Sequence, residues 1–203
     1  NMHRHTGSRL QGLLAMPGHS HPLRGFTLIE LMITLAIAAV LMMVAVPSFI
    51  SFQRNSELTT AANTILGAMN TARTEAMKRN RNAIMAPTGT GWSSGWQVFI
   101  DTDRNGAFTA GELVVATYPA IPAYFSITGT GNASGTTPYV LFNGSGYASD
   151  VNGALGNLNI DIARNDLSGT ELLAQTRRIK VANTGRVRVC KATDTVNCTA
   201  SGI

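Results

Sequence analysis

A short acidic segment in the middle of the chain contains the residue types that bind a hard metal ion. Its oxygen-bearing side chains and one glycine follow the EF-hand spacing D-x-[DN]-x-[DN]-G-x5-E, in the order Asp101, Asp103, Asn105, Gly106 and Glu112. The flanking residues 97–100 and 113–118 have the composition of β-strands rather than helices, and Asn-Gly is a strong signal for a type I′ hairpin turn. We therefore expect a β-hairpin without a metal, with calcium binding as the less favoured alternative, and we predict no cofactor.

Positive charge is concentrated at the C-terminal end of the chain. The whole sequence has a formal net charge of +5, and residues 177–203 hold six basic residues but one acid, Asp194. Alternate residues of a strand share a face, so Arg186 and Arg188 are expected to form one pair of cations and Arg178 and Lys180 another. Such a face is typical of a protein that binds the phosphate backbone of nucleic acid, although a solvated basic edge that discourages aggregation has the same pattern.

Histidine chemistry is confined to the beginning of the chain. All four histidines precede Phe26, at positions His3, His5, His19 and His21. If that segment is removed, the remaining protein cannot use a histidine as a general base, as the partner of a nucleophile or as a zinc ligand. The sequence also contains no Walker loop, no G-x-S-x-G motif and no paired-carboxylate signature. We therefore predict that the protein is not an enzyme.

The apolar stretch at residues 26–46 is long enough to cross a membrane as a helix. A buried core helix is rarely apolar on every face, and a secretory signal is shorter and places its small residues after the apolar run. Its one charge is Glu30, which costs about 2.5–3.5 kcal/mol within the membrane on insertion scales. Glu30 either reaches water at the membrane edge or pairs with a cation, and a chain cut before Phe26 would supply an amine.

The remaining elements predict a helix followed by a β-rich region. Helical spacing of apolar residues continues from Leu58 to Ala76, with a kink expected at Pro47, where the chain lacks an amide donor. The basic cluster Lys78, Arg79 and Arg81 is expected to close the helix, and Pro87 to mark the break after it. Short β-like runs then alternate with Gly, Asn, Asp and Pro. The predicted strands cover residues 97–100, 113–118, 123–128, 139–143, 158–163, 177–181 and 185–190.

Two segments resemble known families. The run Arg24-Gly25-Phe26-Thr27-Leu28-Ile29-Glu30-Leu31 resembles the class III signal of type IV prepilins and type II secretion pseudopilins. This resemblance implies cleavage after Gly25 by prepilin peptidase, N-methylation of Phe26 and docking of the subunit into a filament through Glu30. The stretch from Gly95 to Gly106 is similar to the G-W-x-hydrophobic-F-x-D-x-D-x-N-G region of the GspH/FimT group of minor pilins.

The GspH/FimT resemblance implies a fold and a function. The implied fold is α+β, the type IV pilin fold, in which a long N-terminal helix packs against an antiparallel, sandwich-like β head. Gly185-Arg186-Val187-Arg188 matches the G-R-x-R motif of FimT-type minor pilins, which bind DNA during natural transformation. A structural or priming minor pilin, or an H-type pseudopilin that does not bind DNA, is the alternative. The candidate DNA-binding residues are Arg178, Lys180, Arg186, Arg188 and Lys191.

Four regions follow from this interpretation. They are a leader at residues 1–25, a transmembrane helix at 26–46, a periplasmic helical half at 47–86 and a head at 87–203. A start at Met16 would shorten the leader to ten residues. We expect a single-pass inner-membrane protein with a periplasmic head that enters a pilus, with prepilin peptidase, other pilins and DNA as partners.

In the oxidising periplasm Cys190 and Cys198 are expected to form a disulfide rather than a two-ligand metal site.

Overall fold

The computed structural model describes residues 25–198, so most of the predicted leader lies outside the described residues. The chain divides into two compact units between Val46 and Pro47, and each unit is considered by itself. Helix α1, Leu28–Arg79, continues through Pro47, so proline does not end it. The larger unit, from Pro47 onward, contains the second part of α1, all strands and a short helix α2, Gly169–Ala174.

The first unit is an apolar helix with a defined N-terminal cap. An 18-residue window of α1 has a mean hydropathy of 2.6 and is not buried within the structure, and no second helix of this kind occurs among residues 25–198. Thr27 and Glu30 form a capping box: the Glu30 amide donates to Thr27 Oγ1 at 3.2 Å, and the Thr27 amide donates to Glu30 Oε2 at 3.3 Å. The sequence therefore builds a capped helix that is long and apolar enough to cross a membrane.

The C-terminal end of α1 corrects the predicted helix boundary at residue 86. Asn80 has a positive φ of 49°, and the amide of Arg81 donates to the carbonyl of Ala76 at 3.1 Å. This is the hydrogen bond of a Schellman motif, which ends the helix at Arg79. Residues 82–87 instead form strand β1, in which Ala83, Ile84 and Met85 are completely buried. The basic cluster that was predicted to close the helix lies at its end, whereas the region boundary at residue 86, set by Pro87, is too late because it includes most of β1.

Nine strands form two antiparallel sheets in the described part of the second unit. The five-stranded sheet has the order β3-β2-β1-β5-β6, and the four-stranded sheet has the order β4-β7-β8-β9. The first sheet comprises β1 Asn82–Pro87, β2 Trp96–Asp101, β3 Val114–Tyr118, β5 Val140–Phe142 and β6 Ala148–Ser149. The second comprises β4 Phe125–Gly129, β7 Leu158–Arg164, β8 Arg177–Val181 and β9 Val187–Lys191. All seven predicted strands are confirmed, whereas β1, the two-residue β6 and α2 were not predicted.

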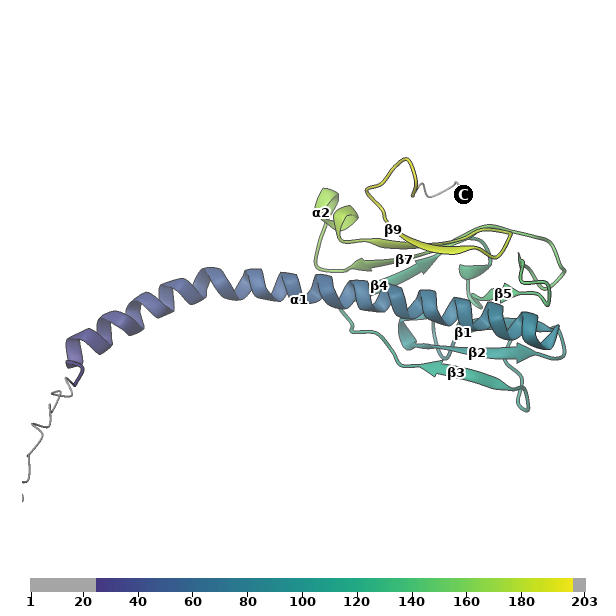
Figure 1. Ribbon diagram of the computed structural model, residues 1–203, viewed down its shortest axis with the longest axis horizontal. Coiled ribbons are helices and arrows are strands. Elements are labelled where there is room, and N and C mark those ends of the chain that lie inside the picture. Colours follow the sequence, from purple (N-terminus) through teal and green to yellow (C-terminus); the bar gives the residue numbers. More distant parts are fainter. Residues whose placement is uncertain (1–24, 199–203) are drawn as a thin grey trace, which may run out of the picture. The chain divides into compact units, whose positions relative to one another are not determined.

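One hydrophobic core joins α1 to both sheets. The helix contributes a stripe of completely buried side chains at helical spacing, among them Leu58, Ile65 and Met69. The same cluster includes Phe142 of the five-stranded sheet and Ile160 of the four-stranded sheet. In Figure 1, β2 and β3 of the five-stranded sheet lie below this part of α1, and β7 and β9 of the four-stranded sheet lie above it. The expected helix with an antiparallel, sandwich-like β region is therefore confirmed for the second unit.

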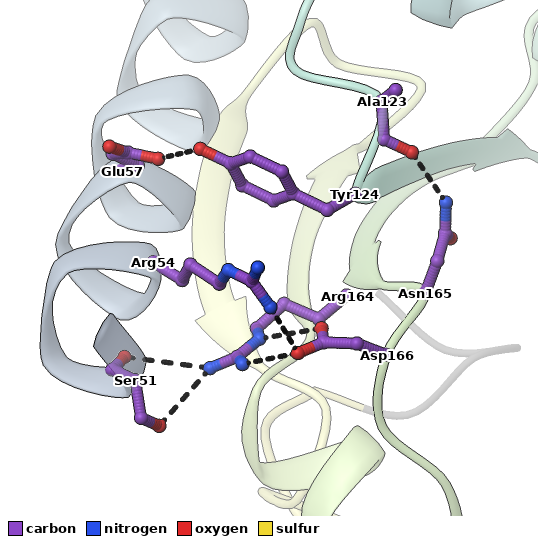
Figure 2. A network of polar contacts seen from close by, with 8 residues as sticks. All are labelled: Ser51, Arg54, Glu57, Ala123, Tyr124, Arg164, Asn165 and Asp166. Carbon is purple, nitrogen blue, oxygen red and sulfur yellow. Dashed lines mark hydrogen bonds and ion pairs between the residues drawn. The ribbon is translucent and has the colours of Figure 1, made fainter. Parts of the chain in front are cut away.

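A polar network fastens α1 to the four-stranded sheet (Figure 2). Arg164 at the end of β7 is only 4% exposed, and its guanidinium donates to both oxygens of Asp166, at 3.0 and 2.7 Å. Arg54 of α1 donates to the same carboxylate at 2.6 Å, and Arg164 also reaches Ser51 Oγ at 3.3 Å. These hydrogen bonds, from Arg164 above all, hold the pKa of Asp166 well below its usual range.

A second part of this network surrounds Tyr124. The guanidinium carbon of Arg54 lies 4.9 Å from the centre of the Tyr124 ring, within the range of a cation–π contact. The Tyr124 hydroxyl donates to the carboxylate of Glu57, one turn further along α1. Each buried or half-buried charge here has a partner within the chain. This balance explains why the network contributes to the attachment of α1 to the sheet rather than to ligand binding.

Candidate functional site

The turn between β8 and β9 determines where the basic residues lie. Gly185 has a φ of +79°, and a Cβ at this position would lie 1.8 Å from the carbonyl oxygen of Gly146. The amide of Gly185 donates to the carbonyl of Ala182, and the amide of Ala182 donates to the carbonyl of Arg186. Only glycine fits this backbone and this close approach. The first residue of the G-R-x-R motif therefore has a structural role: it turns the chain so that Arg186 is exposed at the start of β9.

Arg73 of α1 adds a cation beside this turn. Its guanidinium donates to the carbonyls of Gly146 and Thr184, at 3.0 and 3.5 Å, and its side chain is half-buried. Sequence reasoning missed Arg73 because more than one hundred residues separate it from the G-R-x-R motif. The contact exists only once α1 packs along the sheets, so no local signal could have revealed it.

Strand β9 forms an edge of the four-stranded sheet and carries the exposed cations. Arg186 is exposed and Arg188 is half-buried, and Arg188 donates one hydrogen bond to the carbonyl of Asn197. Lys191 is exposed but alternates to the other face, and it lies about 10 Å along the strand from Arg188. Among the described residues, none of these three forms an ion pair. We call Arg186, Arg188 and Lys191 the basic edge.

The structure corrects the expectation that Arg178 and Lys180 form a second exposed pair. The guanidinium of Arg178 donates to both oxygens of Asp161, at 2.8 and 2.6 Å, and to the carbonyl of Cys198 at 2.9 Å. Lys180 is only 5% exposed, and burial, with the nearby charges of Arg188 and Arg178, lowers the pKa of its amine. Both side chains lie on the outer face of β8, as the alternation predicts, but neither offers an exposed cation. The alternation in the sequence correctly predicts that Arg178 and Lys180 share the outer face of β8, but it does not show which groups pair with them or bury them.

The disulfide between Cys190 and Cys198 is confirmed, with the two Cα atoms 5.9 Å apart. It returns the segment after β9 toward the outer face of the sheet, where the carbonyls of Asn197 and Cys198 accept hydrogen bonds from Arg188 and Arg178. The carboxylate of Asp194 accepts hydrogen bonds from the amides of Val196 and Asn197, so it stabilises the turn in which it lies. The closed segment therefore covers part of the basic face and leaves the Arg186 end open.

The loop between β2 and β3 differs from the predicted tight turn. A type I′ turn needs positive φ at both central residues, but Gly106 has a positive φ of 80° and Asn105 does not. Strand β2 ends at Asp101 and β3 begins at Val114, and the two strands pair in antiparallel fashion. The predicted hairpin is therefore confirmed, but the predicted two-residue turn is wrong. The EF-hand spacing, rather than the Asn-Gly pair, describes this loop. We call residues 101–113 the acidic loop.

Carboxylates converge inside the acidic loop. Ligand oxygens of Asp101, Asp103 and Glu112 lie within 4.8 Å of one another. Asp101 is only 2% exposed, and burial, followed by Asp103 and the charge of Glu112, raises the pKa of its carboxyl. Apolar contacts hold the loop: Phe108 packs edge-on against Phe99 with ring centres 5.4 Å apart. A Cβ on Gly106 would lie 2.4 Å from Val151 Cγ1, so this position also requires glycine.

The predicted processing site lies at the start of the described residues. Gly25 and Phe26 precede α1 and are exposed, as peptidase cleavage would require. The carboxylate of Glu30 belongs to the capping box with Thr27, a local role that the sequence analysis did not foresee. Its docking role in a filament stays a prediction, as do cleavage after Gly25 and methylation of Phe26.

Comparison with known protein families gives a match for the N-terminal segment and another for most of the second unit. The family model described as type II transport protein GspH matches residues 61–194, and the prokaryotic N-terminal methylation motif matches residues 23–46. The type IV minor pilin FimU of Pseudomonas aeruginosa has a similar structure, with a TM-score of 0.52 and 17% identity over 70% of this chain and 95% of that chain. This similarity confirms the type IV pilin fold.

A second solved structure is more distant. The minor pseudopilin EpsH from the type 2 secretion system of Vibrio cholerae covers 66% of this chain and 97% of its own, at 9% identity and a TM-score of 0.46. No curated protein sequence matches the chain.

Proposed function

Because the chain belongs to the GspH family and has the N-terminal methylation motif of filament subunits, we propose that it is a minor pilin whose basic edge binds DNA. The subunit is anchored by α1 in the inner membrane and enters a pilus after cleavage by prepilin peptidase. The head then faces the periplasm or the cell exterior, where it captures DNA for uptake. Family members are structural subunits, and the protein acts by binding rather than by catalysis.

The observation that carries this proposal is the lack of ion pairs at the basic edge. Within residues 25–198, five ion pairs involve Arg54, Lys78, Arg79, Arg164 and Arg178. Arg188 and Lys191 of the edge strand β9 have none, and neither has Arg186, which immediately precedes that strand. A guanidinium has five donors, so the one bond from Arg188 to Asn197 leaves it able to bind phosphate.

Binding at this edge would be independent of sequence. Contacts to phosphate position a protein on DNA but carry no base information, and base recognition needs an element that enters a groove. Strand β9 is short and lies in a sheet whose outer face is partly covered by the disulfide-closed segment. The basic edge therefore fits the backbone of any duplex, which is what capture of unrelated DNA requires.

The test compares two variants that each remove two positive charges. The full chain in detergent micelles is titrated into a fluorescent 30-base-pair duplex, and anisotropy measures the affinity. Arg186→Gln/Arg188→Gln is expected to weaken binding about tenfold, because two phosphate contacts are lost. Lys78→Gln/Arg81→Gln removes exposed cations at the end of α1 and should leave the affinity within about twofold of wild type. Equal weakening by both variants, or by neither, would refute the assigned site.

The GspH match favours one alternative function. An H-type subunit of a type II secretion filament would share the processed N-terminus and the fold but would not bind DNA. In that case the wild-type chain would show no measurable change in anisotropy at low salt. Copurification with other minor pseudopilins, unaffected by the Arg186→Gln/Arg188→Gln variant, would then support the secretion role.

A further inference from the structure

Asp101 presents a charge that the described part of the chain does not neutralise. Its carboxylate is 2% exposed, and among residues 25–198 no hydrogen bond of ordinary geometry reaches either oxygen. Burial and the neighbouring acids raise the pKa of this carboxyl and outweigh the amides of Arg104 and Gly106, which lower it. The nearest acidic side chains, Asp103 and Glu112, add negative charge rather than compensating it. A buried carboxylate without a partner is strongly unfavourable, and proteins usually stabilise one with hydrogen bonds, a cation or a metal.

The other ligands are held in place by the backbone of the loop. The two oxygens of Glu112 accept hydrogen bonds from the amides of Thr102 and Thr109, at 2.6 and 3.0 Å. The carboxylate of Asp103 accepts bonds from the amide of Asn105 and the hydroxyl of Thr109, both at 3.1 Å. Asp103 Oδ2 also accepts a bond from the side-chain amide of Asn105, at 2.8 Å. Asp103 Oδ1 and both oxygens of Glu112 each accept one of these bonds and keep a second lone pair, so the bonds orient the side chains and leave them able to bind an ion.

The spacing of the oxygens fits one ion. Calcium binds oxygen at about 2.3–2.6 Å, so two ligands on opposite sides of it lie at most about 5 Å apart. The ligand oxygens of Asp101, Asp103 and Glu112 lie within 4.8 Å of one another, which satisfies that limit. No Lys or Arg forms an ion pair with any of the three within the described residues, so a solvent cation is the available partner.

We propose that the acidic loop binds one calcium ion through the carboxylates of Asp101, Asp103 and Glu112. This proposal reverses the expectation of a metal-free hairpin, because the buried and unpartnered Asp101 is an observation that the sequence could not supply. The EF-hand spacing of ligands is retained although strands, not helices, flank the loop. Three carboxylates form a site of the charge and ligand type that calcium favours, whereas magnesium usually keeps several waters and avoids all-protein cages.

Calcium binding would order the loop that joins β2 to the edge strand β3. Gly106 against Val151 and Phe108 against Phe99 already tie the loop to the second unit. An ion that neutralises Asp101 would add stability to the same region. Extracellular modules bind calcium with Kd values of about 0.1–1 mM, so an affinity in or somewhat below this range would suit a subunit outside the cytoplasm.

The test titrates calcium chloride into the chelator-treated full chain in detergent micelles. Calorimetry should detect one site, and the thermal unfolding midpoint should rise by about 5–10 °C at a calcium concentration one hundred times Kd. Magnesium chloride at the same concentration should raise it by less than half as much. Absence of both heat and a midpoint shift with calcium would overturn the proposal.

Three variants locate the site. Asp101→Asn keeps the shape of the side chain and should abolish the calcium-dependent shift, as should Asp103→Asn, whose side chain is exposed and whose replacement is tolerated more easily. Glu171→Gln on α2 removes an equal charge outside the loop and should retain the full shift. A wild-type calcium response in both loop variants would overturn the proposal, and so would loss of the response in Glu171→Gln. None of these outcomes depends on DNA binding.

Discussion

The basic edge of β9 and the acidic loop between β2 and β3 both carry charge that no described residue of opposite sign pairs with, yet they differ in geometry. Arg186 and Lys191 are exposed and lie along an edge strand, whereas Asp101 is buried and its neighbours are held by backbone amides. Cations at an edge strand, with Arg186 and Arg188 on one face and Lys191 on the other, suit a long polyanion whose position can vary. A closed group of carboxylates suits one ion of defined size.

The network around Arg164 shows the third possibility, in which the chain supplies both partners. Arg164 is as buried as Asp101, but Asp166 and Ser51 satisfy its guanidinium (Figure 2). The three regions together teach that burial alone does not mark a ligand site. A buried charge with a protein partner is structural, and a buried carboxylate that lies beside further carboxylates without a partner indicates a cation that the chain does not provide. The buried amine of Lys180 also has no hydrogen-bond partner among the described residues, but burial and the nearby cations Arg188 and Arg178 lower its pKa, so it does not mark a ligand site.

The largest separate effect on one of these two regions is expected from adding one methyl group at Gly185, the glycine that precedes the basic edge. Gly185→Ala leaves every charge in place but brings a Cβ to 1.8 Å from the carbonyl of Gly146. We expect the free energy of unfolding to fall by about 3 kcal/mol, and DNA affinity to fall because β9 shifts. Calcium binding should persist, because the acidic loop joins β2 to β3 at one edge of the five-stranded sheet, whereas Gly146 lies between β5 and β6 at the other edge. Urea unfolding and calcium titration of the variant check this separation, and loss of both activities together would contradict it.

A smaller effect on the free energy of unfolding is expected at Asp166, whose charge is already paired with that of Arg164. Asp166→Asn should lower the free energy of unfolding at pH 7 by about 2 kcal/mol, because Arg164 is left buried without its anion. The folded state depresses the pKa of Asp166, so the ionised carboxylate stabilises the protein above about pH 4 and loses that effect as the pH falls further. The difference between wild type and variant should therefore shrink by pH 3.

Urea unfolding at pH 7 and pH 3 measures this difference, with Glu171→Gln as the matched removal of an acid that acts on Arg164 only through its charge and forms no ion pair with it. Neither DNA affinity nor the calcium response should change in Asp166→Asn. If wild type and Asp166→Asn differed in stability by the same amount at pH 7 and at pH 3, the ion pair with Arg164 would not be the cause of the difference.

Much of the fold was predictable because it depends on local patterns. The apolar run of residues 26–46, the alternating strands and the cysteine pair each identify their element without tertiary information. Strand β1 was missed because Ala83, Ile84 and Met85 are buried on every side and show no alternation. The end of α1 depends on the positive φ of Asn80, which a sequence pattern suggests only weakly.

The site was less predictable because it depends on what covers each side chain. The G-R-x-R motif correctly marked the open end of β9, but the pairing of Arg178 with Asp161 and the burial of Lys180 arise from strands and a tail that meet only in the fold. Arg73 reaches the β8–β9 turn from α1 in the same way. For the acidic loop the spacing suggested calcium only as the less favoured alternative, and the structure showed that Asp101 is buried without a hydrogen bond of ordinary geometry.

The salt dependence of DNA affinity tests the central claim most directly. For a protein that neutralises Z phosphates, the logarithm of the association constant falls with the logarithm of salt concentration with a slope of about −0.9Z. Arg186→Gln/Arg188→Gln should make this slope less negative by about 2 relative to wild type, while Lys78→Gln/Arg81→Gln should leave it unchanged. A slope that is the same in wild type and in Arg186→Gln/Arg188→Gln would contradict the assignment of the basic edge as the DNA-binding surface.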